Sequence, residues 1–156
     1  MQVSWSDRHG GAAIAACCDL RLGTSDTRFG FPIARTLGNC LSVRNLARLS
    51  ALIGAARVKE LIFTARLIEA NEALRIGLLT EAARGRAELD ARVDALADAI
   101  AGFAPLTLRA TKEGLRRLQT NQAPDEDLIL MCYMSEDFRE GMDAFLEKRN
   151  PKWRGS

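Results

Sequence analysis

Four cysteines and a single histidine are the side chains of this sequence best suited to act as nucleophiles or metal ligands. Catalysis by a cysteine–histidine or serine–histidine pair would have to use His9, because there is no other histidine. Cys17 and Cys18 are adjacent, whereas Cys40 and Cys132 are isolated, so the spacing fits neither a metal site nor a disulfide framework. We therefore expect buried, reduced thiols in a cytoplasmic protein, no bound metal, and a surface position for His9.

A pair of glycines, Gly10-Gly11, precedes a run of small residues from Ala12 to Cys18. Glycine lets the backbone approach a ligand closely, and a helix N-terminus carries partial positive charge, so this arrangement could hold an oxyanion. A tight turn that packs a helix on a sheet needs the same residue types. The local sequence alone favours the turn.

Hydrophobic periodicity predicts the elements that must position these residues. Residues 1–9 have no periodicity and are expected to form an irregular leader. Strands or extended segments are expected at 19–22, 28–32 and 78–81, with a turn at 23–26. Helical spacing predicts helices near 12–18, 41–53, 58–62, 70–76, 89–103, 105–118 and 135–148, the last with Ser135 as its N-cap.

The composition excludes several classes of protein. The 156 residues include 22 Lys plus Arg against 20 Asp plus Glu, a net charge of +2. This balance does not indicate nucleic acid or an anionic membrane as a partner, and no apolar run is long enough to span a bilayer. Without repeats or a dividing linker, periodicity predicts a helix-rich α/β domain.

Three stretches resemble segments of the crotonase (enoyl-CoA hydratase/isomerase) superfamily. They are HGGAAIAACCDLR at 9–21, TRFGFP at 27–32 and SEDFREGMDAFLEKR at 135–149, which are similar to the family's glycine segment, its "ARFG-x-P" stretch and its C-terminal helix. TARLI at 64–68 and EALRIGL at 72–78 match the connecting pattern. Their order and spacing make the resemblance specific.

The resemblance implies a fragment of the α/β fold called the ClpP/crotonase ββα spiral. Residues 10–84 would form part of the spiral core, and residues 85–156 a helical C-terminal region used for oligomerisation. The N-terminal half of the family fold, which supplies one oxyanion N–H and much of the coenzyme A pocket, has no counterpart here. The resemblance also implies an acyl-CoA thioester as substrate, no further cofactor, and a homo-oligomer, either a trimer or a hexamer.

The same resemblance assigns the backbone N–H of Gly10 to the oxyanion hole and places Gly11 beside the substrate. Hydratases of the family use two glutamates as a general acid/base pair. The corresponding positions hold Ala13 and Ile33, and neither side chain can move a proton. Ordinary hydration of an enoyl-CoA is therefore not expected.

Other side chains offer further candidates. Asn39 or Cys40 could line the acyl pocket, and Asp26 is a nearby carboxylate, although a turn residue and a buried thiol are the simpler interpretations of Asp26 and Cys40. The proton-handling residue stays open. In the last helix the resemblance places Phe145 and Lys148 at the coenzyme A nucleotide; the alternatives are a core phenylalanine and a solvated lysine.

Two functions remain open at this point. The first is an acyl-CoA enzyme of non-hydratase type, acting as part of a longer chain or with a complementing subunit. The second is a truncated, non-catalytic remnant that only folds and self-associates.

Overall fold

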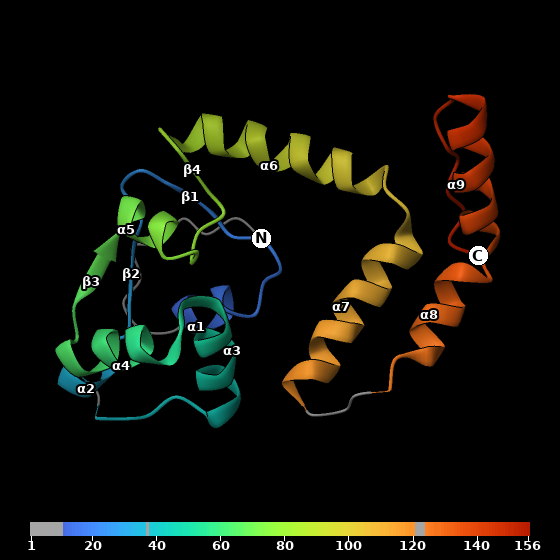
Figure 1. Cartoon of the computed structure of the whole chain (residues 1–156). Coiled ribbons are helices and arrows are strands. Elements are labelled where there is room, and N and C mark those ends of the chain that lie inside the picture. Colours follow the sequence, from blue (N-terminus) through green and yellow to red (C-terminus); the bar gives the residue numbers. More distant parts are fainter. Residues whose placement is uncertain (1–10, 37, 121–123) are drawn as a thin grey trace. The chain divides into compact units, whose positions relative to one another are not determined.

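The computed structural model describes residues 11–36, 38–120 and 124–156 (Figure 1). The chain divides into two compact units, the first ending at Asp94 and the second running from Ala95 to Ser156. The boundary lies within helix α6 (Arg86–Ala101).

The first unit combines short strands with helices. In chain order it contains α1 (Gly11–Ala15), β1 (Leu22–Thr24), β2 (Arg28–Gly30), α2 (Ile33–Thr36), α3 (Val43–Ile53), α4 (Ala55–Thr64), β3 (Leu67–Glu69), α5 (Ala70–Arg75) and β4 (Glu81–Ala83). β1 and β4 pair in parallel, with Leu22 opposite Glu81. β2 and β3 pair antiparallel, with Phe29 opposite Ile68.

The core of this unit is formed where the helices and the two small sheets present apolar side chains. The hydroxyl of Ser42 accepts the N–H of Asn45 and so caps α3, which ends at Gly54 with a φ of 78° that glycine adopts without strain. Leu49 of α3 and Leu61 of α4 are fully buried in one apolar cluster. The predicted helix boundary at residue 54 is confirmed.

The extended segment expected at 28–32 contains β2, but the other two strand predictions were displaced along the sequence. A strand was expected at 19–22, but β1 begins at Leu22, and the expected turn residues Gly23 and Thr24 belong to the strand because they pair with β4. The strand expected at 78–81 is likewise displaced to Glu81–Ala83. Leu78 and Leu79 instead donate their N–H groups to the carbonyl of Ala73, at the end of α5, and bury their side chains.

The second unit consists of helices, namely the end of α6, then α7 (Pro105–Gln119), α8 (Glu126–Tyr133) and α9 (Glu136–Glu147). Pro105 occupies the first turn of α7, where its missing N–H costs nothing. The hydroxyl of Ser135 accepts the N–H of Phe138 at 2.9 Å, which confirms the predicted N-cap of α9. Lys148 ends α9 in the left-handed conformation.

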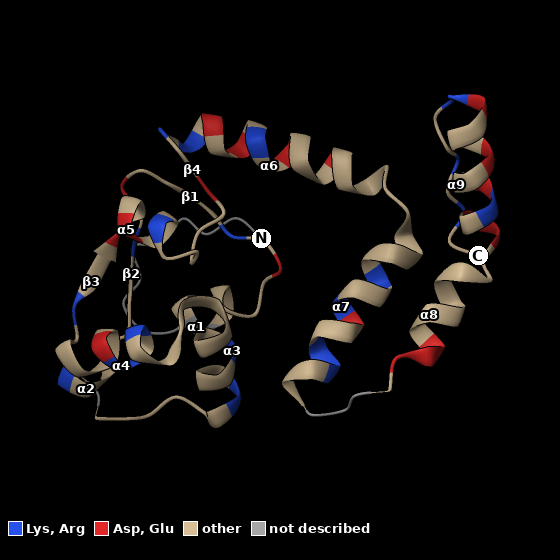
Figure 2. Cartoon of the chain, in the orientation of Figure 1, with Lys and Arg blue, Asp and Glu red and all other residues tan. Residues whose placement is uncertain are grey.

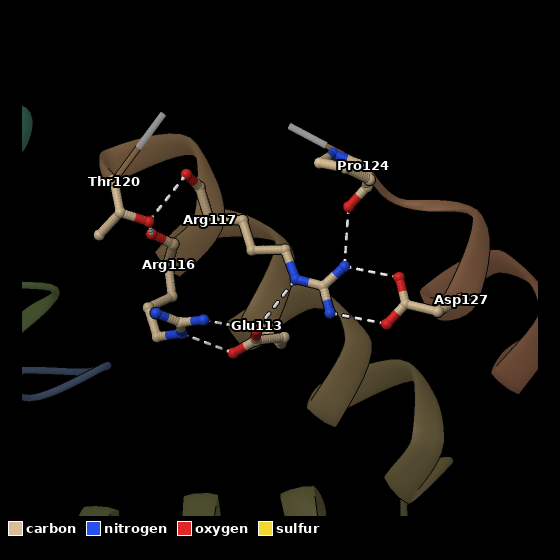
Figure 3. A network of polar contacts seen from close by, with 6 residues as sticks. All are labelled: Glu113, Arg116, Arg117, Thr120, Pro124 and Asp127. Atoms are coloured by element: carbon tan, nitrogen blue, oxygen red, sulfur yellow. Dashed lines mark hydrogen bonds and ion pairs between the residues drawn. The ribbon is translucent and has the colours of Figure 1, made fainter. Parts of the chain in front are cut away.

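An arginine joins α7 to α8 (Figure 3). Arg117 donates to both carboxylate oxygens of Asp127, at 2.6 and 2.7 Å, and to the carbonyl of Pro124 at 2.7 Å. Its Nε donates to the carboxylate of Glu113, which also accepts hydrogen bonds from Nε and Nη2 of Arg116. The network holds the two helices together at the ends that flank the loop between them.

Three half-exposed glutamates accept arginine hydrogen bonds, which lower the pKa of each carboxyl from 4.5 to about 2. They are Glu60, bound mainly by Arg66; Glu113, bound mainly by Arg116; and Glu140, bound mainly by Arg149. A folded-state pKa below the unfolded value stabilises the fold above the unfolded pKa, and this contribution is lost as the pH falls towards the folded one. We expect the free energy of unfolding to decline between about pH 4.5 and about pH 2.

Urea denaturation at a series of pH values measures this decline. The variant Glu113→Gln should be less stable at pH 7 and should show a shallower decline, because one of the three carboxyls no longer titrates. A flat stability profile between about pH 5 and about pH 2.5 would contradict the account of these ion pairs.

Candidate functional site

The glycine segment lies at the start of the first unit. Gly10 lies outside the described residues, so the predicted oxyanion N–H is not tested. Gly11 is buried and is the first residue of α1, which has five residues. Ala13 lies within the same short helix. The small-residue helix therefore begins at the second glycine of the pair.

Ile33, the second position that lacks a glutamate, is the first residue of α2. Its side chain is 7% exposed and belongs to the same apolar cluster as Ala15 and Ala16, the residues at the end of α1. An ionisable side chain at residue 33 would lose its hydration in these surroundings without a charged partner. The isoleucine is a packing residue of the core in this chain.

The candidates between α2 and α3 point to solvent. Asn39 and Cys40 are both exposed, so the interpretation of Cys40 as a buried thiol was wrong. Asp26 lies in the turn closed by hydrogen bonds between Thr24 and Thr27, which confirms its interpretation as a turn residue.

None of the four cysteines, all of which the structure describes, forms a disulfide bond. The expected burial was wrong, because Cys17, like Cys40, is exposed, and Cys18 and Cys132 are half-buried. The Sγ of Cys17 accepts a hydrogen bond from the guanidinium of Arg48 at 3.2 Å.

The two residues expected at a nucleotide lie at the C-terminal end of α9, in the second unit. Phe145 is 81% exposed, so its interpretation as a core residue was wrong. Lys148 is exposed, with a φ of 53°, and its N–H closes the last turn by donating to the carbonyls of Ala144 and Phe145. Within the described residues its ammonium has no carboxylate partner. An aromatic ring and an unpaired cation three residues apart are a chemically suitable pair for a base and a phosphate.

Two buried charges escaped the sequence analysis, and the first is Arg21. The side chain is 6% exposed, and its Nε donates to the carbonyl of Leu78 at 2.7 Å while Nη1 donates to the carbonyl of Cys18. Burial lowers the pKa of Arg21, although a guanidinium remains protonated at neutral pH. The guanidinium thus ties the segment after α1 to the segment before β4. In the sequence, only the alternation of charged and apolar residues at 19–22 indicated that the side chain of Arg21 has a fixed orientation.

The second buried charge is Asp137, in the first turn of α9 and 4% exposed. Its carboxylate accepts the backbone N–H groups of Arg154 and Gly155 at 2.6 and 2.8 Å. No sequence signal identifies it, because an acidic residue after an N-cap is ordinarily solvated.

Among the residues that the structure describes, no three His, Cys, Asp or Glu side chains are grouped as metal ligands. No helix in these parts of the chain is both long enough and apolar enough to cross a membrane.

Comparison with solved structures defines the class of protein. The structure of an enoyl-CoA hydratase/carnitine racemase from Magnetospirillum magneticum superposes with a TM-score of 0.81 and 31% identity, covering 94% of this chain and 55% of that one. The chain therefore has a crotonase-like α/β fold, as a fragment of the complete family fold.

Sequence comparison gives the family. The model of the enoyl-CoA hydratase/isomerase family matches residues 7–156, and the chain belongs to this family. The short-chain-enoyl-CoA hydratase of Clostridium acetobutylicum is 37% identical over 145 residues, which are 90% of this chain and 55% of that protein. The crotonyl-CoA hydratase of Syntrophomonas wolfei is 35% identical over 145 residues, which are again 90% of this chain and 55% of that protein. The chain spans about half the length of these relatives.

Proposed function

We propose that this chain is an acyl-CoA thioester-binding member of the family that does not carry out standard hydration. Membership of the enoyl-CoA hydratase/isomerase family supports the substrate class. The single observation that carries the rest is the environment of Ile33, a buried core residue where the resemblance expects a proton-transferring glutamate.

In this proposal the chain corresponds to the C-terminal part of the family fold. Residues 10–84 contribute part of the spiral core, and residues 85–156 form the helical region. The N–H of Gly10 is one oxyanion donor, with Gly11 beside the acyl group and with Asn39 and Cys40 at the acyl pocket. The second oxyanion donor belongs to a segment outside this chain. Removal of one such donor typically costs about a hundred- to a thousandfold in rate.

Phe145 and Lys148 are proposed as contacts to the nucleotide of coenzyme A. The support is their exposure at the C-terminal end of α9, together with the ammonium of Lys148, which no described carboxylate neutralises. Lysine acts towards phosphate as a point charge, so its exposed position is suitable for an incoming ligand.

A hydration assay tests the catalytic part of the proposal. Purified chain mixed with crotonyl-CoA at neutral pH should give no hydration above background, because neither Ala13 nor Ile33 can transfer a proton. A family hydratase with both glutamates, assayed in parallel, verifies the substrate. Turnover by this chain of even about 1 per second, an ordinary enzymatic rate, would contradict the proposal.

A second candidate function is self-association without catalysis, as a truncated remnant. The large apolar side chains exposed on the second unit favour it, namely Leu108, Leu115, Leu118, Ile129, Leu130, Tyr133, Met134, Phe138, Met142, Phe145 and Leu146. A set of this size on one unit is typical of an interaction surface. We propose that copies of this chain associate through α7–α9 into a trimer or a hexamer.

A further inference from the structure

The chain after α9 folds back along that helix, and its first anchor is Asp137. The carboxylate accepts the N–H groups of Arg154 and Gly155, and the N–H of Asp137 donates to the carbonyl of Ser156 at 3.1 Å. These bonds join the first turn of the helix to backbone atoms 17 to 19 residues further along. We call residues 149–156 the latch.

A second anchor lies one turn further along the helix, at Glu140. Its carboxylate accepts both terminal nitrogens of Arg149, at 2.6 and 3.0 Å, and the N–H of Lys152 at 2.7 Å. Two carboxylates spaced three residues apart lie on one side of a helix, so both can hold the same returning segment. Acidic and basic side chains accordingly interleave along α9 and the latch (Figure 2).

Between these anchors the indole of Trp153 lies against Gly141. A methyl group at the α-carbon of Gly141 would be 3.2 Å from the ring, so the glycine provides the space for the indole. Trp153 is also one wall of a cavity of about 230 Å³ whose other lining residues include Leu106, Cys132 and Met142. The latch therefore covers one side of a mainly apolar pocket that is partly open to solvent and contains a half-buried thiol.

The part of the latch beyond Arg149 can open without unwinding α9, because residues 150–156 include neither cap residue of the helix. Ser135 caps the N-terminus, and the N–H groups of Lys148 and Arg149 donate to carbonyls of the last turn. When the latch opens, water replaces the two N–H donors of Asp137. The carboxylate then remains favourable near the positive end of the helix.

We propose that the latch is a conformational device that opens separately from the helices and controls access to the cavity containing Cys132. Trp153 is its closing side chain, and Asp137 holds it shut. Opening exposes the half-buried thiol, whose Sγ in the closed state donates to the carbonyl of Leu106 at 3.7 Å. This inference concerns the second unit alone and does not depend on the proposed acyl-CoA function.

The rate of thiol labelling measures the opening directly. In a parent carrying Cys17→Ser, Cys18→Ser and Cys40→Ser, the only thiol left is that of Cys132. Reaction with an aromatic disulfide reagent under native conditions should accelerate at least about tenfold in Trp153→Ala, while the far-ultraviolet circular dichroism stays that of the parent. Asp137→Asn keeps the indole but weakens its anchor, and should accelerate labelling several-fold.

Lys152→Ala is the matched control, because its side chain is exposed and its N–H still bonds Glu140. Its labelling rate should equal that of the parent. Rates in Trp153→Ala and Asp137→Asn within about twofold of the parent would overturn the proposal. So would an acceleration that appears only together with loss of helical signal, since the thiol would then be exposed by unfolding. If Trp153→Ala fails to fold, the labelling rate of Asp137→Asn tests the proposal by the same criteria.

Discussion

Replacing Arg21 by methionine is expected to lower the free energy of unfolding by about 2–3 kcal/mol. Methionine keeps an unbranched apolar side chain but has no N–H, so the carbonyls of Cys18 and Leu78 lose the charge-assisted hydrogen bonds that Arg21 donates. Removing a buried guanidinium also relieves its desolvation, which offsets part of the loss. The loss outweighs the relief because the buried carbonyl of Leu78 and the partly buried carbonyl of Cys18 are left without this donor.

Arg92→Met provides the matched control. Arg92 also lies near β4, where its guanidinium pairs with Glu81, but its side chain is 48% exposed. Exposed ion pairs contribute about 0–1 kcal/mol, so this variant should change stability little. Urea unfolding gives both values. Equal changes in the free energy of unfolding would contradict this prediction, because the buried hydrogen bonds of Arg21 would then contribute no more than an exposed ion pair.

Light scattering at micromolar concentration is expected to give a mass near 51 kDa or a multiple of it, since three copies of a 17.1 kDa chain make a trimer. The reason is the exposed apolar surface of α7–α9, which water disfavours and which a second copy can cover. A single 17.1 kDa species that persists on dilution would contradict the proposed assembly.

Two substitutions in α9 that lower the net charge equally test whether apolar contact drives the assembly. Leu146→Glu places a charge at an apolar residue that is 72% exposed, and should reduce the measured mass. Arg139→Gln changes the net charge by the same amount at an exposed polar residue of the same helix, and should leave the mass unchanged. Equal masses for both variants would place the interface elsewhere.

The helices were largely predictable from the sequence, because their apolar spacing and their ends are local properties. Gly54 ends α3 and Ser135 caps α9, and both were identified from the residue type alone. The strands were less predictable because they are three residues long and their limits depend on partners. β1 begins at Leu22 because this residue pairs with Glu81 of β4, which is distant in the sequence.

The candidate site was predictable in part. Phe145 and Lys148 were chosen from the resemblance to the family's C-terminal helix, but their exposure depends on which side of α9 the chain packs against. Arg21 and Asp137 could not be identified, because their partners are backbone atoms of distant segments, which carry no side-chain signature. Such charges become visible only in the folded chain.

Binding of coenzyme A tests the central claim most directly. Isothermal titration of the purified chain with coenzyme A, acetyl-CoA and longer acyl-CoAs should show saturable binding. Lys148→Gln, which keeps a polar side chain but removes the charge, and Phe145→Ala should each weaken binding by about tenfold, equivalent to about 1.4 kcal/mol. Phe103→Ala, which removes an aromatic ring that is 53% exposed elsewhere in the second unit, should leave it unchanged. Absence of binding at millimolar ligand, or equal affinities in all three variants, would contradict the assignment of this chain as an acyl-CoA-binding protein.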